Sequence, residues 1–386
     1  MSTIWILRFT CLLQIGSMGI LFAFEAVRMK DMGVSEFAIG LILGIASGIF
    51  ILSSIYWGRL ADRKGWHKGI VVCGTVGFIG LLFYFAACVT PVQFFVYAVL
   101  RAIFMPMITG IMPAIAVTSH GDRQQGSKFG VYRAFGSLGF ILGSMVLPLI
   151  FNDIAVVAQA SSVFLIGSLF LVARLPQPKA RQVEHKPLRI RNLDALIKLF
   201  LFSMFFISLA DPAVHQFFNA YARDLGGSTR LLGLLSGSFG IVAFFFLPLM
   251  GRAIDRFRAS SVLVVSMLAQ PLRVFITSTL DDPTQLWIPI LFHGICWGGI
   301  EVAAIVYLSR RVEEGQKASV LSYYMAVRML GMLVGASLCG YVAEHYGYVA
   351  MFRTIAAAAL VGALVYIFGI TVGRIKEKGA LGETLS

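Results

Sequence analysis

Long apolar stretches alternate with short polar ones along the whole chain. About 20 apolar residues in a helix cross a bilayer core of about 30 Å. We therefore predict an all-α membrane protein with twelve transmembrane helices. Their expected ranges are roughly 4–26, 37–57, 69–87, 93–117, 129–150, 154–175, 195–221, 230–250, 260–279, 286–308, 318–342 and 348–372.

The polar segments divide the chain into two halves. We predict an N-terminal six-helix half (1–175), a linker (176–192), a C-terminal six-helix half (193–373) and a short, mobile tail (374–386). A motif in the first half recurs in the second half 193 positions later, as a predicted loop after the second span of each half. The two copies are Gly58-Arg59-Leu60-Ala61-Asp62-Arg63 and Gly251-Arg252-Ala253-Ile254-Asp255-Arg256. The spacing indicates an internal parallel repeat.

The charges support the membrane assignment and predict its orientation. Hydrophobic residues make up 58% of the chain and charged residues 13%, against about 25% charged in a soluble domain. The net charge of +13 resides in short loops, so it does not indicate nucleic-acid binding. If the N-terminus is cytoplasmic, the outer loops hold few cations: Arg28, Lys30, Arg223 and Arg230. The positive-inside rule then predicts that both termini are cytoplasmic.

The repeated motif resembles the signature loop of the major facilitator superfamily, whose members are transporters of twelve spans in two halves. The resemblance implies that Asp62 and its loop hold the cytoplasmic side closed in one state. The proposed latch residues are Gly58, Asp62, Arg63, Asp255 and Arg256. The alternative is a tight, positively charged loop without a mechanical role. Tyr307 to Gly315 and Gly340 to Gly347 resemble the sugar-efflux and oligosaccharide–proton symporter side of the superfamily.

Charged residues within the predicted spans are candidates for proton coupling. Each costs about 2.5–3.5 kcal/mol at a helix centre, so it normally faces a cavity or a partner. We expect two groups: Asp211 and Glu301 with Arg328, and Glu25 with Arg101. A carboxylate near an arginine in a cavity could carry a proton. A static ion pair that aligns the helices is the alternative.

Neutral polar residues extend the first group. Asp211, His215 and Asn219 recur every four residues, so a continuous helix would place them on one face. We expect a substrate cavity lined by His215, Gln216, Asn219, His293, Trp297 and Arg133. The histidines could instead serve only as hydrogen-bonding groups between helices.

A row of small residues predicts close helix packing. Gly136, Gly139 and Gly143 allow a neighbouring helix to approach. Family antiporters carry a Gly-Pro motif in this region, whereas this chain has Phe140. The difference argues against a drug–proton antiporter.

These observations predict a secondary transporter of the bacterial inner membrane. We expect a monomer that moves a small polar organic solute, sugar-like or an organic acid, by alternating access with protons. A drug or metabolite exporter is the alternative, and a receptor or scaffold is a further class. No nucleotide loop, metal motif or nucleophile arrangement suggests an enzyme, a cofactor or a metal site. The five scattered cysteines fit neither a disulfide framework nor a metal site.

Overall fold

The computed structural model describes residues 2–119, 125–175, 190–313 and 316–383, and these residues form helices and turns without a β-strand. The N-terminal half contains α1 (Thr3–Asp31), α2 (Glu36–Lys64), α3 (His67–Ala87), α4 (Pro91–Thr109), α5 (Ile111–Ser119), α6 (Gln125–Ile141), η1 (Leu142–Val146), α7 (Leu147–Ile150) and α8 (Ile154–Ala173). Most of the predicted linker, 176–189, lies outside the described residues.

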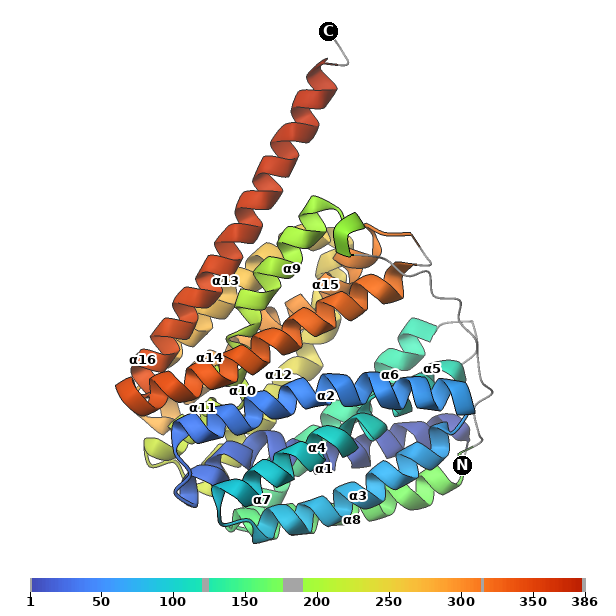
Figure 1. The fold of residues 1–386 in the computed structure, drawn as a ribbon, viewed down its shortest axis with the longest axis vertical. Coiled ribbons are helices and arrows are strands. Elements are labelled where there is room, and N and C mark those ends of the chain that lie inside the picture. The colour runs from blue at the N-terminus through green and yellow to red at the C-terminus, as the bar shows by residue number, and fades with distance from the viewer. Residues whose placement is uncertain (1, 120–124, 176–189, 314–315, 384–386) are drawn as a thin grey trace.

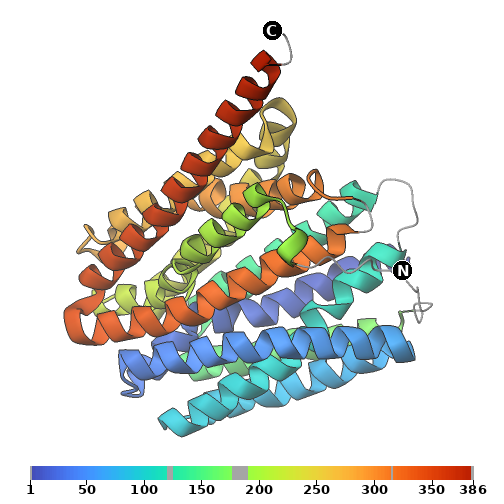
Figure 2. The same cartoon turned by 45° about the horizontal axis from the view of Figure 1, so that its top comes forward.

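The C-terminal half begins after η2 (Ile190–Asn192). It contains α9 (Ala195–Ser208), α10 (Asp211–His215), α11 (Phe217–Asp224), α12 (Thr229–Arg256), α13 (Ala259–Thr277), η3 (Pro283–Leu286), α14 (Trp287–Leu291), η4 (Gly294–Gly298), α15 (Gly299–Ser309) and α16 (Lys317–Glu383). Figures 1 and 2 show the two halves as separate bundles, blue to green and green to red.

Eleven segments of the described chain are long and apolar enough to cross a membrane. The last, Ser319–Val372, has 54 residues, which exceeds the length of one span. Within it, Gly347 adopts φ 81° and ψ 167°, a left-handed conformation that glycine tolerates. Figure 1 shows α16 as two arms that meet at a sharp turn. The multi-pass, all-helical prediction is confirmed, whereas twelve crossings and cytoplasmic termini stay predictions.

The structure corrects the predicted loop at 58–68 and its repeat in the second half. The predicted loop at 58–68 is mostly the end of α2, which stays helical to Lys64. Gly65 ends the helix because it takes the left-handed φ of 66° that suits a helix terminus. Its repeat is likewise helical to Arg256. The predicted tail begins within α16, which continues to Glu383, and its mobility stays a prediction.

Several predicted spans are interrupted within the membrane. The seventh consists of α9, α10 and α11 rather than one helix. Pro212 lies in the first turn of α10 and has no N–H to continue the α9 bonding pattern. The tenth span changes from η3 to α14, then to the π-helical segment η4 and to α15. These breaks direct Asp211 and His293 toward the space between the halves.

Glycines bring α1 and α6 into close contact, as the sequence predicted. A Cβ on Gly139 would lie 1.9 Å from the Leu12 carbonyl oxygen, and one on Gly143 would lie 1.8 Å from the Gly16 carbonyl oxygen. The second half repeats the arrangement, because a Cβ on Gly335 would lie 2.5 Å from the Leu209 carbonyl oxygen. Small residues thus set the spacing of the first and fifth spans in both halves.

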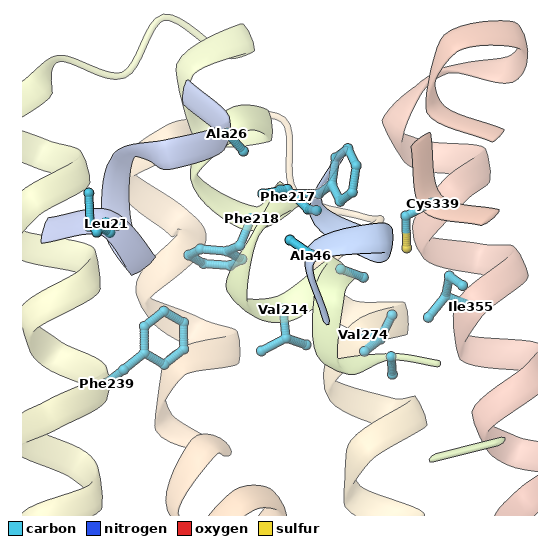
Figure 3. Close-up of a cluster of buried hydrophobic side chains, with 14 of the residues drawn as sticks. Leu21, Ala26, Ala46, Val214, Phe217, Phe218, Phe239, Val274, Cys339 and Ile355 are labelled. Atoms are coloured by element: carbon cyan, nitrogen blue, oxygen red, sulfur yellow. The ribbon is translucent and has the colours of Figure 1, made fainter. Parts of the chain in front are cut away.

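The apolar core continues from one half into the other. Figure 3 shows Leu21 and Ala26 near Phe217 and Phe218, and all four side chains are at most 3% exposed. The ribbons of the two halves lie close at this end of the bundle and diverge toward the end that holds the N-terminus (Figure 1). The two halves therefore meet at one end of the molecule, and the candidate site residues lie behind that contact.

Candidate functional site

A cavity of about 330 Å³ lies between the two halves. It is lined by α1 and α6 on one side and by α10, α12, the tenth span and α16 on the other. Most of its surface is apolar, with Phe22, Phe140 and Phe239 among the lining residues. Charged groups enter it from both halves, through Arg133, Asp211 and Arg328. An apolar cavity with a few convergent polar groups is the usual form of a small-molecule site.

Arg328, in α16, contacts carboxylates of both interrupted spans of the C-terminal half. Its Nη1 lies 2.6 Å from Glu301 Oε2, and its Nη2 lies 3.3 Å from Asp211 Oδ2. The Asp211 side chain is 12% exposed and the Glu301 side chain 27%. The structure thus brings the first predicted charged group together. Both carboxylates share one guanidinium, and only Asp211 and Arg328 line the cavity.

Most of the predicted polar lining is present. His215, Gln216, His293, Trp297 and Arg133 all line the cavity. The His293 and Trp297 rings stack, with centroids 5.5 Å apart and planes 6° apart. The His215 ring lies 5.7 Å from His293 in an edge-to-face arrangement. The stacked His293 and Trp297 rings thus form a flat aromatic pair on the cavity wall, with His215 edge-on beside it.

Asn219 lies elsewhere. The helix breaks at Gln216, where φ is −103° and ψ is −51°, so Asp211 and Asn219 do not share one continuous helical face. The Asn219 Nδ2 donates to the Ala23 carbonyl and to Ser236 Oγ, at 2.6 Å each. Asn219 is 3% exposed and is not among the lining residues. It joins the two halves at the closed end.

The sequence reasoning missed Arg273. This residue lies in α13, is 2% exposed, and lines a second, water-sized cavity. The small cavity shares Asp211, His215, Trp297 and Arg328 with the large one, so the two are adjacent. A charged residue within a predicted span was signal enough to find Arg273.

The second predicted group of charges, Glu25 with Arg101, also meets in the structure, but it lies away from the cavity. Arg101 Nε lies 3.0 Å from Glu25 Oε1, between α4 and α1. Their side chains are 13% and 8% exposed, and neither residue lines the cavity between the halves. The arrangement is that of a buried ion pair within the N-terminal half.

The predicted latch residues lie at the opposite end from the closure. Asp62 Oδ1 lies 3.3 Å from His67 Nε2, at the start of α3, and the Asp62 side chain is 74% exposed. The pair joins α2 to α3 within one half. Arg63, Asp255 and Arg256 are exposed, and Gly58 has no atom within 4 Å of an added Cβ.

Reciprocal ion pairs close the other end. Lys30 Nζ lies 2.9 Å from Asp224 Oδ1, and Arg223 Nη2 lies 2.8 Å from Asp31 Oδ2. Lys30-Asp31 and Arg223-Asp224 occupy corresponding positions in the two halves, 193 residues apart. Each cation therefore contacts the acid of the other half. A further contact runs from the Phe37 N–H to Glu344 Oε2, at 2.7 Å.

Comparisons with known proteins agree with this architecture. Residues 4–354 match the model of the "MFS_1 like family". The multidrug resistance protein MdtG of Rahnella sp. (strain Y9602) is 25% identical over 377 residues, covering 92% of this chain and 90% of that protein. MdtG of Klebsiella pneumoniae (strain 342) is 24% identical over 379 residues, with coverage of 92% and 90%.

Solved structures show the same fold. A mutant of the nucleoside transporter NupG aligns with a TM-score of 0.84 at 15% identity, covering 95% of this chain and 99% of that one. A POT family transporter in complex with 5-aminolevulinic acid aligns with a TM-score of 0.75 at 11% identity, covering 95% of both chains. The family match spans nearly the whole chain, the fold is all-helical in its described part with a cavity between its two halves, and the related proteins are transporters rather than enzymes. This chain therefore belongs to the MFS_1 like family of major facilitator superfamily transporters.

Proposed function

We propose that this protein is a proton-coupled secondary transporter of a small polar organic solute, either sugar-like or an organic acid. It acts as a monomer in the bacterial inner membrane and works by alternating access. The observation that supports this proposal is the Asp211–Arg328–Glu301 cluster at the wall of the cavity between the halves. Ionisable groups inside a membrane protein are costly and usually mark substrate or ion pathways.

In this proposal, Asp211 is the residue that binds and releases the coupled proton. Asp211 lines the cavity and makes the longer of the two contacts with Arg328, whereas Glu301 is not among the lining residues. Protonation of Asp211 would remove one of the two charges that Arg328 neutralises. The remaining pair with Glu301 keeps Arg328 partnered, so the change is local and reversible.

The ion pairs at the closed end support alternating access. In this proposal the closed end is the outer side, as positive-inside placement predicts, and the structure corresponds to an inward-open state. Lys30, Asp31, Arg223 and Asp224 then form the outer closure. In the outward-open state, Asp62 and Asp255 with their neighbouring arginines would hold the inner side closed.

Drug export is a second candidate. The mostly apolar cavity surface and the names of the related multidrug resistance proteins favour it. Buried charges on the cavity wall favour the polar solute, because an unmatched charge would weaken the binding of a neutral apolar molecule.

Solute-induced proton movement tests the proposal. Purified protein is reconstituted in liposomes that contain a pH-sensitive dye, and glucose, gluconate or ethidium is added outside. A polar solute is expected to change the luminal pH, and protein-free liposomes provide the control. Proton movement with ethidium alone would favour drug export. No proton movement with polar solutes that enter the liposomes would contradict coupling.

A further inference from the structure

Arg273 is a buried cation without a carboxylate partner. Its side chain is among the largest that are fully buried. Within the described part of the chain, no Asp or Glu oxygen lies within 4.0 Å of its guanidinium. Asp211 and Glu301, the nearby acids, both contact Arg328 instead. An arginine at this depth normally faces a partner or a polar cavity.

The neighbours of Arg273 stabilise it only weakly. Its Nη1 lies 3.2 Å from His293 Nδ1, and its Cζ lies 5.2 Å from the centre of the Phe239 ring. The guanidinium also interacts with the Cys296 thiol, which is a weak acceptor. Arginine has no acceptor atom, so the shared hydrogen bond requires His293 Nδ1 to accept. None of these neutral groups supplies a counter-charge.

The surrounding cavities show where a counter-charge could bind. Arg273 lines the water-sized cavity, together with Asp211 and Arg328, and these two also line the large cavity. The charged residues that line the two adjoining cavities are Arg133, Arg273 and Arg328 against Asp211, and Glu301 pairs with Arg328. These five groups leave an excess of one positive charge, so the two cavities together match a monoanion.

The rest of the large cavity indicates the form of the ligand. Phe22, Phe140 and Phe239 line it, and Trp297 stacks on His293 beside the arginines. An apolar body would contact the aromatic rings while a charged group reaches the wall. Planar guanidinium groups match the two oxygens of a carboxylate.

We propose that Arg328 and His293, with the Arg273 charge behind them, form a binding site for the carboxylate of the transported solute, and that the solute is therefore an organic monoanion. This proposal rests on the proposed transport function and specifies its substrate class. Arg273 is a specificity-determining residue in this account, because it distinguishes an acid from its neutral or cationic analogue.

Matched ligands test the charge preference. Binding to purified protein is measured by calorimetry for gluconate, glucose and glucosamine, and for naphthylacetate, naphthylacetamide and naphthylethylamine. Hydrogen bonds to charged groups exceed neutral ones by enough to give about a tenfold difference. The carboxylate is expected to bind at least about tenfold tighter than its two analogues in one or both sets.

Substitutions at Arg273 test whether this residue causes the preference for the carboxylate. In Arg273→Gln, the carboxylate and its neutral analogue should bind within about threefold of each other. Arg273→Lys should retain the preference with weaker binding, because lysine keeps the charge but loses the planar fork. Arg28→Gln is the matched control: Arg28 is 8% exposed, donates to the Phe85 and Ala86 carbonyls, and lies outside the cavity. It should retain the preference.

Two results would overturn the proposal. One is equal or tighter binding of the neutral or cationic member in both sets, and the other is an unchanged carboxylate preference in Arg273→Gln. Neither depends on the transport experiment. A neutral solute that moves protons in liposomes would preserve the transport function and exclude the anion site.

Discussion

At the scale of single residues, Arg328 connects three parts of the C-terminal half through two carboxylates. Its partners lie in α10 and α15, at 3.3 Å and 2.6 Å. Removal of one member of a buried ion pair leaves a charge without compensation, at a cost of about 3–5 kcal/mol. Arg328 therefore contributes more to stability than either acid, because each acid can be lost while the other remains paired with it.

Arg328→Gln should accordingly destabilise the protein more than Asp211→Asn. The first change leaves both Asp211 and Glu301 without a cation, whereas the second leaves Arg328 paired with Glu301. We expect a lower thermal unfolding temperature for Arg328→Gln in detergent, partly restored when Asp211→Asn is added. Equal unfolding temperatures for the two single variants would show that the shared guanidinium has no such role.

The sequence predicted the meeting of these charges because buried charges in a membrane seek partners. Glu25 and Arg101 meet for the same reason. Spacing could not place Asn219, since the helix breaks at Gln216, where the backbone departs from helical geometry. The small residues of the fifth span predicted the close helix packing correctly, because only small side chains allow two helix backbones to approach each other.

At the scale of helices, contact of α1 with α6 and η1 depends on the absence of side chains at Gly139 and Gly143. A methyl group on Gly139 would overlap the Leu12 carbonyl oxygen at 1.9 Å. The helix breaks were harder to predict, because apolar composition is the same in α-helical and π-helical segments such as η4. The motif at Gly58 was expected to be a loop, yet its charged residues remain in α2 up to Gly65.

Gly139→Ala should therefore force α1 and α6 apart and lower the unfolding temperature. Gly80→Ala provides the control, because Gly80 lies in α3 with nothing within 4 Å of an added Cβ. Alanine is favoured over glycine in a helix by about 1 kcal/mol, so the control should be neutral or stabilising. A similar drop in unfolding temperature in both variants would contradict the role of close contact between the helices. The measurement is thermal unfolding with size-exclusion chromatography.

At the scale of the whole molecule, the repeat makes the ion pairs at the closed end symmetric. Two copies of one cation–acid pair, exchanged between the halves, produce two reciprocal ion pairs. The repeat itself was visible in the sequence. The pairing between halves was not, because it depends on which state the two bundles adopt.

Reversal of one ion pair should open the outer side. Asp31→Arg places two cations together, and Asp31→Arg with Arg223→Asp restores an opposite pair. A cysteine introduced at Ala23, which is 4% exposed, reports opening through labelling by an impermeant maleimide in a background without the five native cysteines. We expect faster labelling in the single variant and a return toward the original rate in the double variant. Unchanged labelling in the single variant would exclude these residues from the closure.

Asp211→Asn tests the central claim most directly, in liposomes loaded with a solute that moves protons. Net uptake driven by a pH gradient should be lost, because the variant cannot carry the proton. Exchange of labelled for unlabelled solute at equal concentrations should continue, because exchange requires no net proton release. Uptake against a gradient that persists in Asp211→Asn but is lost in Glu25→Gln would contradict the account and place coupling in the N-terminal half.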